Sequence, residues 1–306
     1  MELRHRDADS QGPPSPPEPH ATTEGLHIAL MGIDGAGKST IAVELAKALR
    51  TTGREVEIIN FKRAMAGADP AVAGVLFHVA FAALRAQYAE AVPADPLSDL
   101  DALLARDDDS AKFAQTEDRL RAVPVERNAP RPLLSSAVLE IVGGFWVQAY
   151  VESRLRAGVV VVNDSFGYKH ALKNALLAQR LSEPGSPVHD AARRVLETAR
   201  SLFHALLRPT YGYWIDTDPR LALRWRAETG EVTTPFESYG LAGESGDASF
   251  LAMQEDCRPA FREAAREWRW QRIALDDVPQ QENIARAVRL IEQDALRHLE
   301  RARAAH

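Results

Sequence analysis

The sequence lacks several features that would assign it to a specialised class of protein. It has a single cysteine, Cys257, among 306 residues, which excludes an internal disulfide framework and any structural zinc site that needs several thiolates. The longest nearly apolar run, Ala71–Leu84, is interrupted by His78 and is shorter than the roughly 18 residues needed to span a bilayer. We therefore expect no membrane span, and the lone thiol favours a reducing, cytoplasmic location.

An excess of positive charge is also missing. Lys and Arg number 37 and Asp and Glu number 43, so the formal net charge is −6. This balance gives no general attraction to nucleic acid or to anionic lipid, and we expect neither as a partner. Residues 1–24 are charged and then proline-rich, without the apolar core of a secretory signal, and are predicted to be a disordered tail.

The rest of the sequence alternates short apolar runs with longer helical segments, which is typical of a parallel sheet covered by helices. The predicted strands are Leu26–Met31, Val56–Phe61, Val159–Val162, Tyr211–Asp216 and Arg272–Leu275. The predicted helices are Ile41–Arg50, Pro70–Val92, Leu133–Ala157, Pro187–Leu207, Pro219–Glu228, Ser249–Trp268 and Pro279–Arg303. This order predicts one α/β domain over residues 25–306, with five parallel strands, helices on both faces and a ligand site beyond the carboxyl ends of the strands.

Two segments interrupt this pattern. The first, at about 65–133, is predicted to contain a helical insertion joined by loops. The second, at about 227–248, is rich in Gly, Thr and Ser and is predicted to be a mobile loop.

A phosphate-binding loop follows the first predicted strand. Residues 32–39 satisfy G-x-x-x-x-G-K-[ST] between a strand and an amphipathic helix, where backbone N–H groups and the helix N-terminus favour a bound phosphate. Lys38 is expected to reach the β- and γ-phosphate oxygens of ATP, and the Ser39 hydroxyl to ligate Mg²⁺. The expected nucleotide-binding residues are Gly32, Ile33, Asp34, Gly35, Ala36, Gly37, Lys38, Ser39 and Thr40.

A second magnesium ligand is expected at the end of a neighbouring strand. Asp164 follows the β-branched run Val159–Val162 and Asn163, so its carboxylate is placed to hold the metal or its water shell. An Asp in this position is also a common cap for the next helix, and both roles can hold together.

The loop and several later segments resemble the thymidylate kinases, a branch of the P-loop nucleoside-monophosphate kinases with an acidic residue inside the loop. After GIDGAGKST, the segments VVVVNDSF, RPTYGYWIDTDPRLALRWR, PFE and RIALDDVPQQENI are similar to family segments in the same order. The resemblance covers roughly residues 25–64 and 134–295. It implies a P-loop kinase fold, a lid at about 227–248, and transfer of the γ-phosphoryl group of ATP to a nucleoside monophosphate with Mg²⁺.

The resemblance also assigns roles to single residues. It places Asp34 near the acceptor sugar or its phosphate, and Arg224, joined by Arg226, near the ATP base or phosphates. For both arginines the alternative is a solvated helix face. Together with Lys38 and Asp164, these arginines are the expected catalytic residues.

The acceptor side departs from the family pattern at the phosphate. The family's arginine after the strand-end Asp is Ser165, and the lid has no Lys or Arg from Ala227 to Glu244. Lys169 or Lys173 could compensate as point charges, or could be exposed helix lysines. Lys62 and Arg63, after the second strand, are candidate acceptor-phosphate ligands or surface-loop residues.

The base-reading arginine of the family is missing as well, because no Lys or Arg lies between Arg131 and Arg154. The glycine pair Gly143–Gly144 is expected to open space there, and Phe145 or Trp146 to stack on a flat acceptor. The alternative for these aromatics is packing in the core.

Three functions remain open. The first is an ATP- and Mg²⁺-dependent phosphotransferase whose acceptor is a nucleoside monophosphate other than dTMP, or a related small molecule. The second is a nucleotide-binding module with weak or no phosphotransfer, and the third a kinase of a non-nucleotide small molecule. The resemblance also implies a homodimer, for which the apolar helix at Ala71–Leu84 offers a surface, although as a core helix it needs no partner.

Overall fold

The computed structural model describes residues 25–90, 127, 129–164, 167–231, 233–234, 236–241 and 246–304. The predicted tail, the greater part of the predicted insertion beyond residue 90, and Ser165 lie outside these residues.

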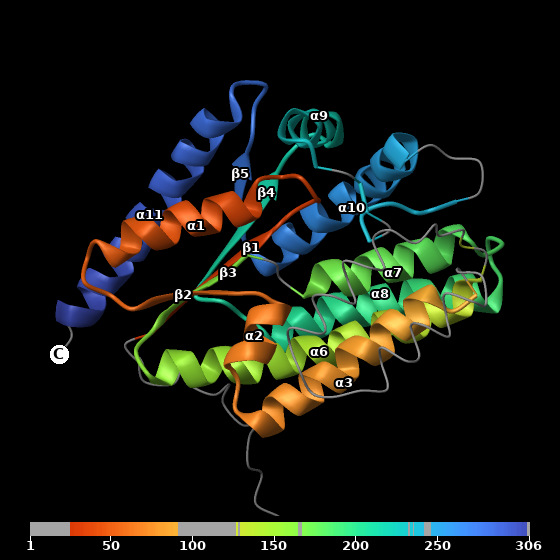
Figure 1. Ribbon diagram of the computed structural model, residues 1–306, viewed down its shortest axis with the longest axis horizontal. Helices are drawn as coiled ribbons and strands as arrows, with labels where there is room; N and C mark the ends of the chain where they lie inside the picture. Colours follow the sequence, from red (N-terminus) through yellow and green to blue (C-terminus); the bar gives the residue numbers. More distant parts are fainter. Residues whose placement is uncertain are drawn as a thin grey trace, which may run out of the picture.

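Five parallel strands form a single sheet in the order β2-β3-β1-β4-β5 (Figure 1). Their bounds are β1 Leu26–Met31, β2 Val56–Ile59, β3 Val160–Asn163, β4 Tyr211–Asp216 and β5 Gln271–Ala274. The central strand β1 is buried along its whole length and pairs with β3 on one side and β4 on the other. The chain therefore changes direction across the sheet at β1, which opens a crevice at the carboxyl end of that strand. The α/β class and the parallel five-stranded sheet are confirmed.

Nine helices surround the sheet in the described part of the chain, with α1 and α11 on one face and α6, α7 and α10 on the other (Figure 1). Helix α3 packs along α6, while α8 packs mainly along α7 and also touches α6. The bounds are α1 Lys38–Arg50, α2 Phe61–Gly67, α3 Pro70–Tyr88, α6 Pro130–Arg156, α7 Tyr168–Arg180, α8 Pro187–Leu206, α9 Pro219–Thr229, α10 Gly246–Trp268 and α11 Gln280–Ala304.

The core has two clusters of buried apolar side chains. The larger one surrounds the sheet, and the smaller one joins α3 and α6 to β2 and β3 through residues such as Phe77, Phe81 and Val161. By length and composition alone, α3 and α6 could each cross a bilayer. In the fold they lie side by side as core helices do, and the absence of a membrane span stays a prediction.

Helix α2 was not predicted, α7 was expected only as a helix of unstated bounds after Asp164, and β2 ends at Ile59 rather than at Phe61. The apolar Phe61 suggested that β2 continues to that residue. Instead the Asn60 side chain accepts a hydrogen bond from the Arg63 backbone N–H at 3.0 Å and caps α2. The outer parts of the predicted loop at 227–248 also belong to helices, since α9 continues to Thr229 and α10 begins at Gly246.

The glycine pair of α6 lies against two aromatic rings, and of the two glycines Gly144 also lines a cavity. A Cβ atom at Gly143 would lie 2.6 Å from Cε2 of Phe61, and one at Gly144 would lie 2.8 Å from Cζ of Phe203. Both distances are far below van der Waals contact. The pair therefore lets two aromatic rings approach the helix backbone closely.

Replacing Gly144 with alanine should reduce the free energy of unfolding by about 1–3 kcal/mol, because the new methyl group overlaps the Phe203 ring. Gly74 of α3 is the matched control, since a Cβ there meets no atom within 4 Å. Gly74→Ala should stabilise the protein by about 0.5–1 kcal/mol through its lower backbone entropy. Urea unfolding followed by circular dichroism measures both, and equal effects would contradict the close approach of Phe203.

Candidate functional site

The loop after β1 has the backbone geometry of an anion-binding turn. Gly35 and Gly37 adopt left-handed conformations with φ of 71° and 76°, which residues with a Cβ rarely do. A Cβ at Gly32 would lie 2.5 Å from the carbonyl oxygen of Ile215, so that position also requires glycine. Helix α1 then begins at Lys38 without a side-chain cap. Its first N–H groups are thus left for an anion.

Lys38 is folded back onto this loop. Its Nζ atom donates to the Ile33 carbonyl oxygen at 2.5 Å, and its side chain is buried. Burial, reinforced by the charge of Lys169, lowers the pKa of Lys38 to about 7. The next two residues, Ser39 and Thr40, are exposed on the first turn of α1. An anion at the loop would therefore meet the ammonium group and the helix N-terminus together.

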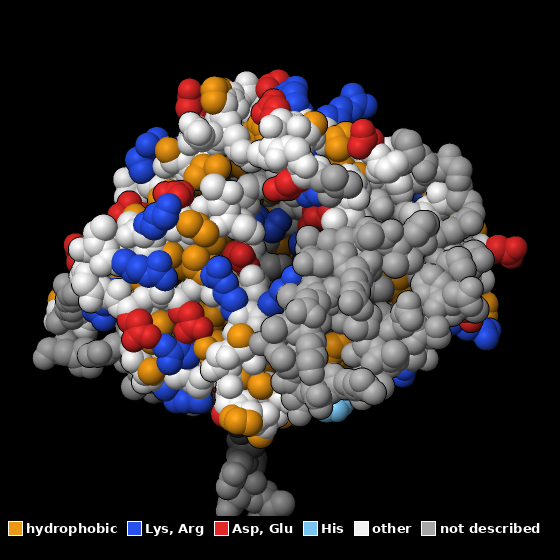
Figure 2. Space-filling view, viewed as in Figure 1, with side chains coloured by type: hydrophobic (Ala, Val, Ile, Leu, Met, Phe, Trp, Pro, Cys, Tyr) orange, Lys and Arg blue, Asp and Glu red, His pale blue; other side chains and the backbone are white. Residues whose placement is uncertain are grey.

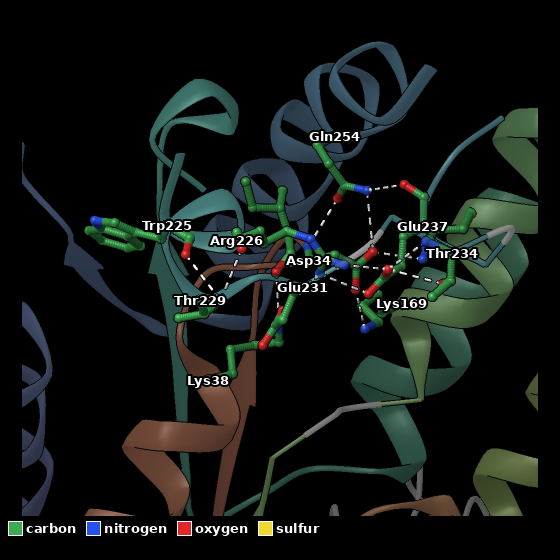
Figure 3. A network of polar contacts seen from close by, with 12 residues as sticks. Asp34, Lys38, Lys169, Trp225, Arg226, Thr229, Glu231, Thr234, Glu237 and Gln254 are labelled. Atoms are coloured by element: carbon green, nitrogen blue, oxygen red, sulfur yellow. Dashed lines mark hydrogen bonds and ion pairs between the residues drawn. The ribbon is translucent and has the colours of Figure 1, made fainter. Parts of the chain in front are cut away.

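The carboxylate of Asp34 is the centre of a buried polar cluster. It accepts from Lys169 Nζ at 2.8 Å and from Lys173 Nζ at 2.7 Å, both on α7. Gln254 of α10 donates to the same carboxylate at 3.2 Å and accepts from the Asp34 backbone N–H at 3.0 Å (Figure 3). Burial alone would raise the pKa of Asp34, but Lys169 and Lys173 outweigh it and hold the pKa well below its usual range.

Asp164 lies at the carboxyl end of β3, beside the start of α1. Its side chain is buried, and its Oδ1 atom has no hydrogen-bond partner among the residues that the structure describes. Burial raises the pKa of Asp164, while the charge of Arg63 and a hydrogen bond with Ser39 oppose this rise. An orphaned carboxylate oxygen next to a serine hydroxyl is the kind of oxygen donor set that Mg²⁺ prefers. The two residues expected to hold the metal, Ser39 and Asp164, therefore fit it chemically.

A cavity of about 530 Å³ extends from the loop into the space between α3, α6, α7 and α8. Its apolar walls include Leu84, Val147 and the rings of Phe61, Phe203 and Phe236. Its polar walls include Lys62, Gln87, Glu140, Gln148, Asp164, Lys169, His170 and Lys173. One end thus carries phosphate-binding chemistry, and the other could hold a small, partly apolar molecule.

The two candidate arginines of α9 have different positions. Arg226 is buried beside the loop, where its Cδ atom would lie 3.0 Å from a Cβ at Gly35. It forms an ion pair with Glu237, at 3.1 and 2.8 Å, and with Glu231 at 3.4 Å (Figure 3). Arg224 instead is exposed, pairs with Asp277 and does not line the cavity. This position on α9 is that of a solvated helix face, which was the alternative for Arg224, and its approach to the ATP base or phosphates stays a prediction.

The candidate acceptor ligands are also divided. Lys62 lines the cavity from the first turn of α2. Arg63 does not line it but donates to the Ile58 carbonyl oxygen at 3.2 Å, near enough for its charge to act on Asp164. Phe145 and Trp146 are packed against the two core clusters and do not line the cavity, which favours the core alternative for both; their stacking on the acceptor stays a prediction. Helical spacing explains this, since the cavity-lining residues of α6 recur about every four positions.

Three further residues of the cavity wall, Glu140, His170 and Lys173, are absent from the set expected from the sequence. Lys173 was considered there only as an alternative to Lys169, whereas the structure joins both to Asp34. The sequence held no signal for this pairing, because two lysines four residues apart on one helix are typical of a solvated face.

Comparison with models of known protein families gave no match, and comparison with curated proteins gave none either. The geometry of the site itself is therefore the basis for a functional proposal.

Asp34→Asn should lower the free energy of unfolding by about 3 kcal/mol, because it leaves two buried lysines without their counter-charge. Removing one of these charges as well, in Asp34→Asn/Lys173→Met, should recover part of the loss. Since the folded-state pKa of Asp34 is depressed, its contribution is complete above the ordinary value of 3.8 and is lost as the pH falls through the depressed value.

Chemical denaturation at pH 7 and in increasing acid measures this contribution. Glu44→Gln is the matched control, because its ion pair with Lys47 is exposed, and it should change stability little. A loss from Asp34→Asn no larger than that of the control would contradict the role of the cluster.

Proposed function

We propose that this protein is an ATP- and Mg²⁺-dependent phosphotransferase with a P-loop kinase fold. It would transfer the γ-phosphoryl group of ATP to a nucleoside monophosphate or a related small anionic acceptor. One observation carries the proposal: the left-handed glycine loop with Lys38 lines the same cavity as Asp164 and Ser39. One oxygen of Asp164 has no partner among the described residues. The resemblance to thymidylate kinases and the strand order support the same proposal.

On the nucleotide side, the loop N–H groups and Lys38 would bind the β- and γ-phosphates. Ser39 and Asp164 would hold Mg²⁺, which when bound neutralises charge on the phosphate oxygens. The enclosed position of Lys38 and Asp164 strengthens their interaction with charge because little water competes there. The work of these residues is to position groups and stabilise charge rather than to form covalent bonds.

On the acceptor side, the local charges favour an anion. Lys169 and Lys173 share the single carboxylate of Asp34, so this group of three side chains carries one more positive than negative charge. Asp164 and Glu140 line the same cavity, and burial raises the pKa of both carboxyl groups, which favours their neutral forms. Over the visible face of the protein, by contrast, basic and acidic side chains are interspersed (Figure 2). With a net charge of −6, an anionic acceptor would be attracted only by such local cations.

A nucleotide-binding module with weak phosphotransfer is the second candidate. It is supported by Arg226, whose guanidinium group lies beside the loop but is already paired with Glu231 and Glu237. In that state the arginine does not offer its full charge to a transferring phosphoryl group. The cytoplasmic location, the homodimer and the non-nucleotide acceptor remain predictions from the sequence.

Lys38→Ala and Asp164→Asn should each reduce ADP formation with the best acceptor by at least roughly 100-fold, because each removes a charge next to the transferred group. Asp164→Asn should change ATP affinity much less than turnover. A panel of nucleoside monophosphates, nucleosides and phosphorylated metabolites, assayed by coupled ADP release, identifies the acceptor first. Lys47→Ala, at an exposed position of α1, is the control and should be fully active. ADP formation that survives Lys38→Ala would refute the proposed enzyme.

ATP binding should take up a proton at pH 8. Lys38 is mostly neutral there because its pKa is about 7, and bound phosphates raise that pKa and recharge the amine. Affinity should therefore fall as the pH rises above 7, by up to about tenfold per pH unit. Isothermal titration calorimetry in two buffers with different ionisation enthalpies measures the uptake. Lys38→Met has no amine at this position and should show none; an equal uptake by this variant would assign the proton to another group.

A further inference from the structure

Two ionisable side chains of the cavity wall are without a partner among the residues that the structure describes. The side chains of Glu140 on α6 and His170 on α7 form no hydrogen bond or ion pair there. Both are partly buried. Burial lowers the pKa of His170 to about 3 and raises that of Glu140 to about 7, so the imidazole is neutral and the carboxyl group readily changes its charge. Polar groups in such positions are normally paired, so these two are available to a ligand.

Glu140 is not needed to hold its helix in place. The contact between α6 and α7 already has a buried hydrogen bond of 3.0 Å from Asn174 Nδ2 to Ser136 Oγ, one turn before Glu140. The same face of α6 continues through Gly144, where Phe203 lies against the backbone, to Gln148. Packing therefore accounts for the position of the helix, and the carboxyl group of Glu140 remains to be explained by what the cavity binds.

The surroundings of Glu140 restrict the chemistry of that ligand. The charges of Lys173 and Lys169 both act on its carboxyl group. They would repel a cationic ligand group, so the complementary group is neutral. In its ionised form, which bound donors stabilise, the carboxyl group has two oxygens that each accept hydrogen bonds and that repel the lone pairs of carbonyl groups. The best partner is thus a pair of adjacent N–H or O–H donors.

We propose that Glu140 determines acceptor specificity by binding a pair of neutral hydrogen-bond donors on the acceptor, while Lys169 and Lys173 attract its anionic group. This inference rests on the phosphotransferase function proposed above. Two kinds of molecule carry such a donor pair together with a phosphate: a guanine nucleotide, through its ring N–H and amino group, and a sugar phosphate with adjacent hydroxyl groups. Thymine and uracil nucleotides present a single N–H between two carbonyl groups and should be rejected.

Binding is measured by calorimetry on the full chain in the presence of a non-hydrolysable ATP analogue and Mg²⁺. GMP is compared with IMP, which lacks only the amino group, and ribose 5-phosphate is compared with 2-deoxyribose 5-phosphate, which lacks one hydroxyl group of the adjacent pair. The fifth ligand, dTMP, presents a single N–H between two carbonyl groups and is expected to be rejected. At least one donor-pair ligand should bind roughly 10- to 100-fold more tightly than its matched partner and than dTMP. Glu140→Gln, which replaces one acceptor oxygen by a donor, should remove that preference and leave binding of the ATP analogue unchanged.

Glu183→Gln is the matched control, because Glu183 is exposed in the turn between α7 and α8. Two results would overturn the specificity role of Glu140. The first is a preference within the GMP/IMP or ribose/deoxyribose pair that persists in Glu140→Gln, and the second is dTMP binding as tight as that of every donor-pair ligand. Equal binding within both pairs would overturn it as well. These readouts do not need turnover. Selective binding without ADP formation would therefore refute the phosphotransferase but support the specificity role of Glu140. Phosphorylation of dTMP at full rate by both the wild-type protein and Glu140→Gln would support the phosphotransferase but refute the specificity role of Glu140.

Discussion

The carboxylate of Asp34 holds together the parts of the molecule that form the cavity. It belongs to the loop after β1, and it binds two lysines of α7 and the amide of Gln254 from α10. The chain separations are large, 135 and 139 residues to the lysines and 220 to the glutamine. The phosphate-binding loop and the wall of the acceptor cavity are thus fixed relative to each other by one buried group, whose neutralisation would leave two ammonium groups without compensation.

The same cluster explains how a protein with a net charge of −6 can keep a site suited to anions. Exposed charges of both signs largely cancel at a distance and are screened by salt. Inside the cavity the screening is weak, so the charges of the two lysines that share Asp34 act strongly but only over a short range. Arg226 shows the opposite arrangement, because Glu231 and Glu237 surround its guanidinium group and leave it little net charge.

Local signals in the sequence predicted the sheet and the loop, but not the acceptor wall. β1 and β4 have the predicted bounds because each is a short apolar run between clear breakers. The end of β2 was misjudged because an apolar Phe61 follows the capping Asn60, and the cap is visible only once the Arg63 N–H is seen to bind it. Phe145 and Trp146 were chosen by residue type, whereas the cavity is lined by the residues whose helical phase faces it.

Long-range pairing was the part that no local pattern could reveal. A lysine four residues after another lysine on an amphipathic helix has the signature of a solvated face. Lys169 and Lys173 differ from such solvated lysines only because both donate to the carboxylate of Asp34, which lies more than a hundred residues away in the sequence.

One carboxylate shared by two ammonium groups also suits a site that must be stable both empty and filled. Without a ligand, Asp34 gives each lysine a partner, so neither is left as an isolated buried charge. If an anion enters beside them, one lysine can turn to it while the other keeps Asp34, and every charge still has a counter-charge. A single lysine would have to give up its only partner, and an arginine in its place would be held by a rigid two-point contact. Each ammonium group of α7 is flexible and makes a single bond to Asp34. Exchanging the Asp34 carboxylate for the anion of a ligand therefore costs less free energy with a lysine than with an arginine held at two points.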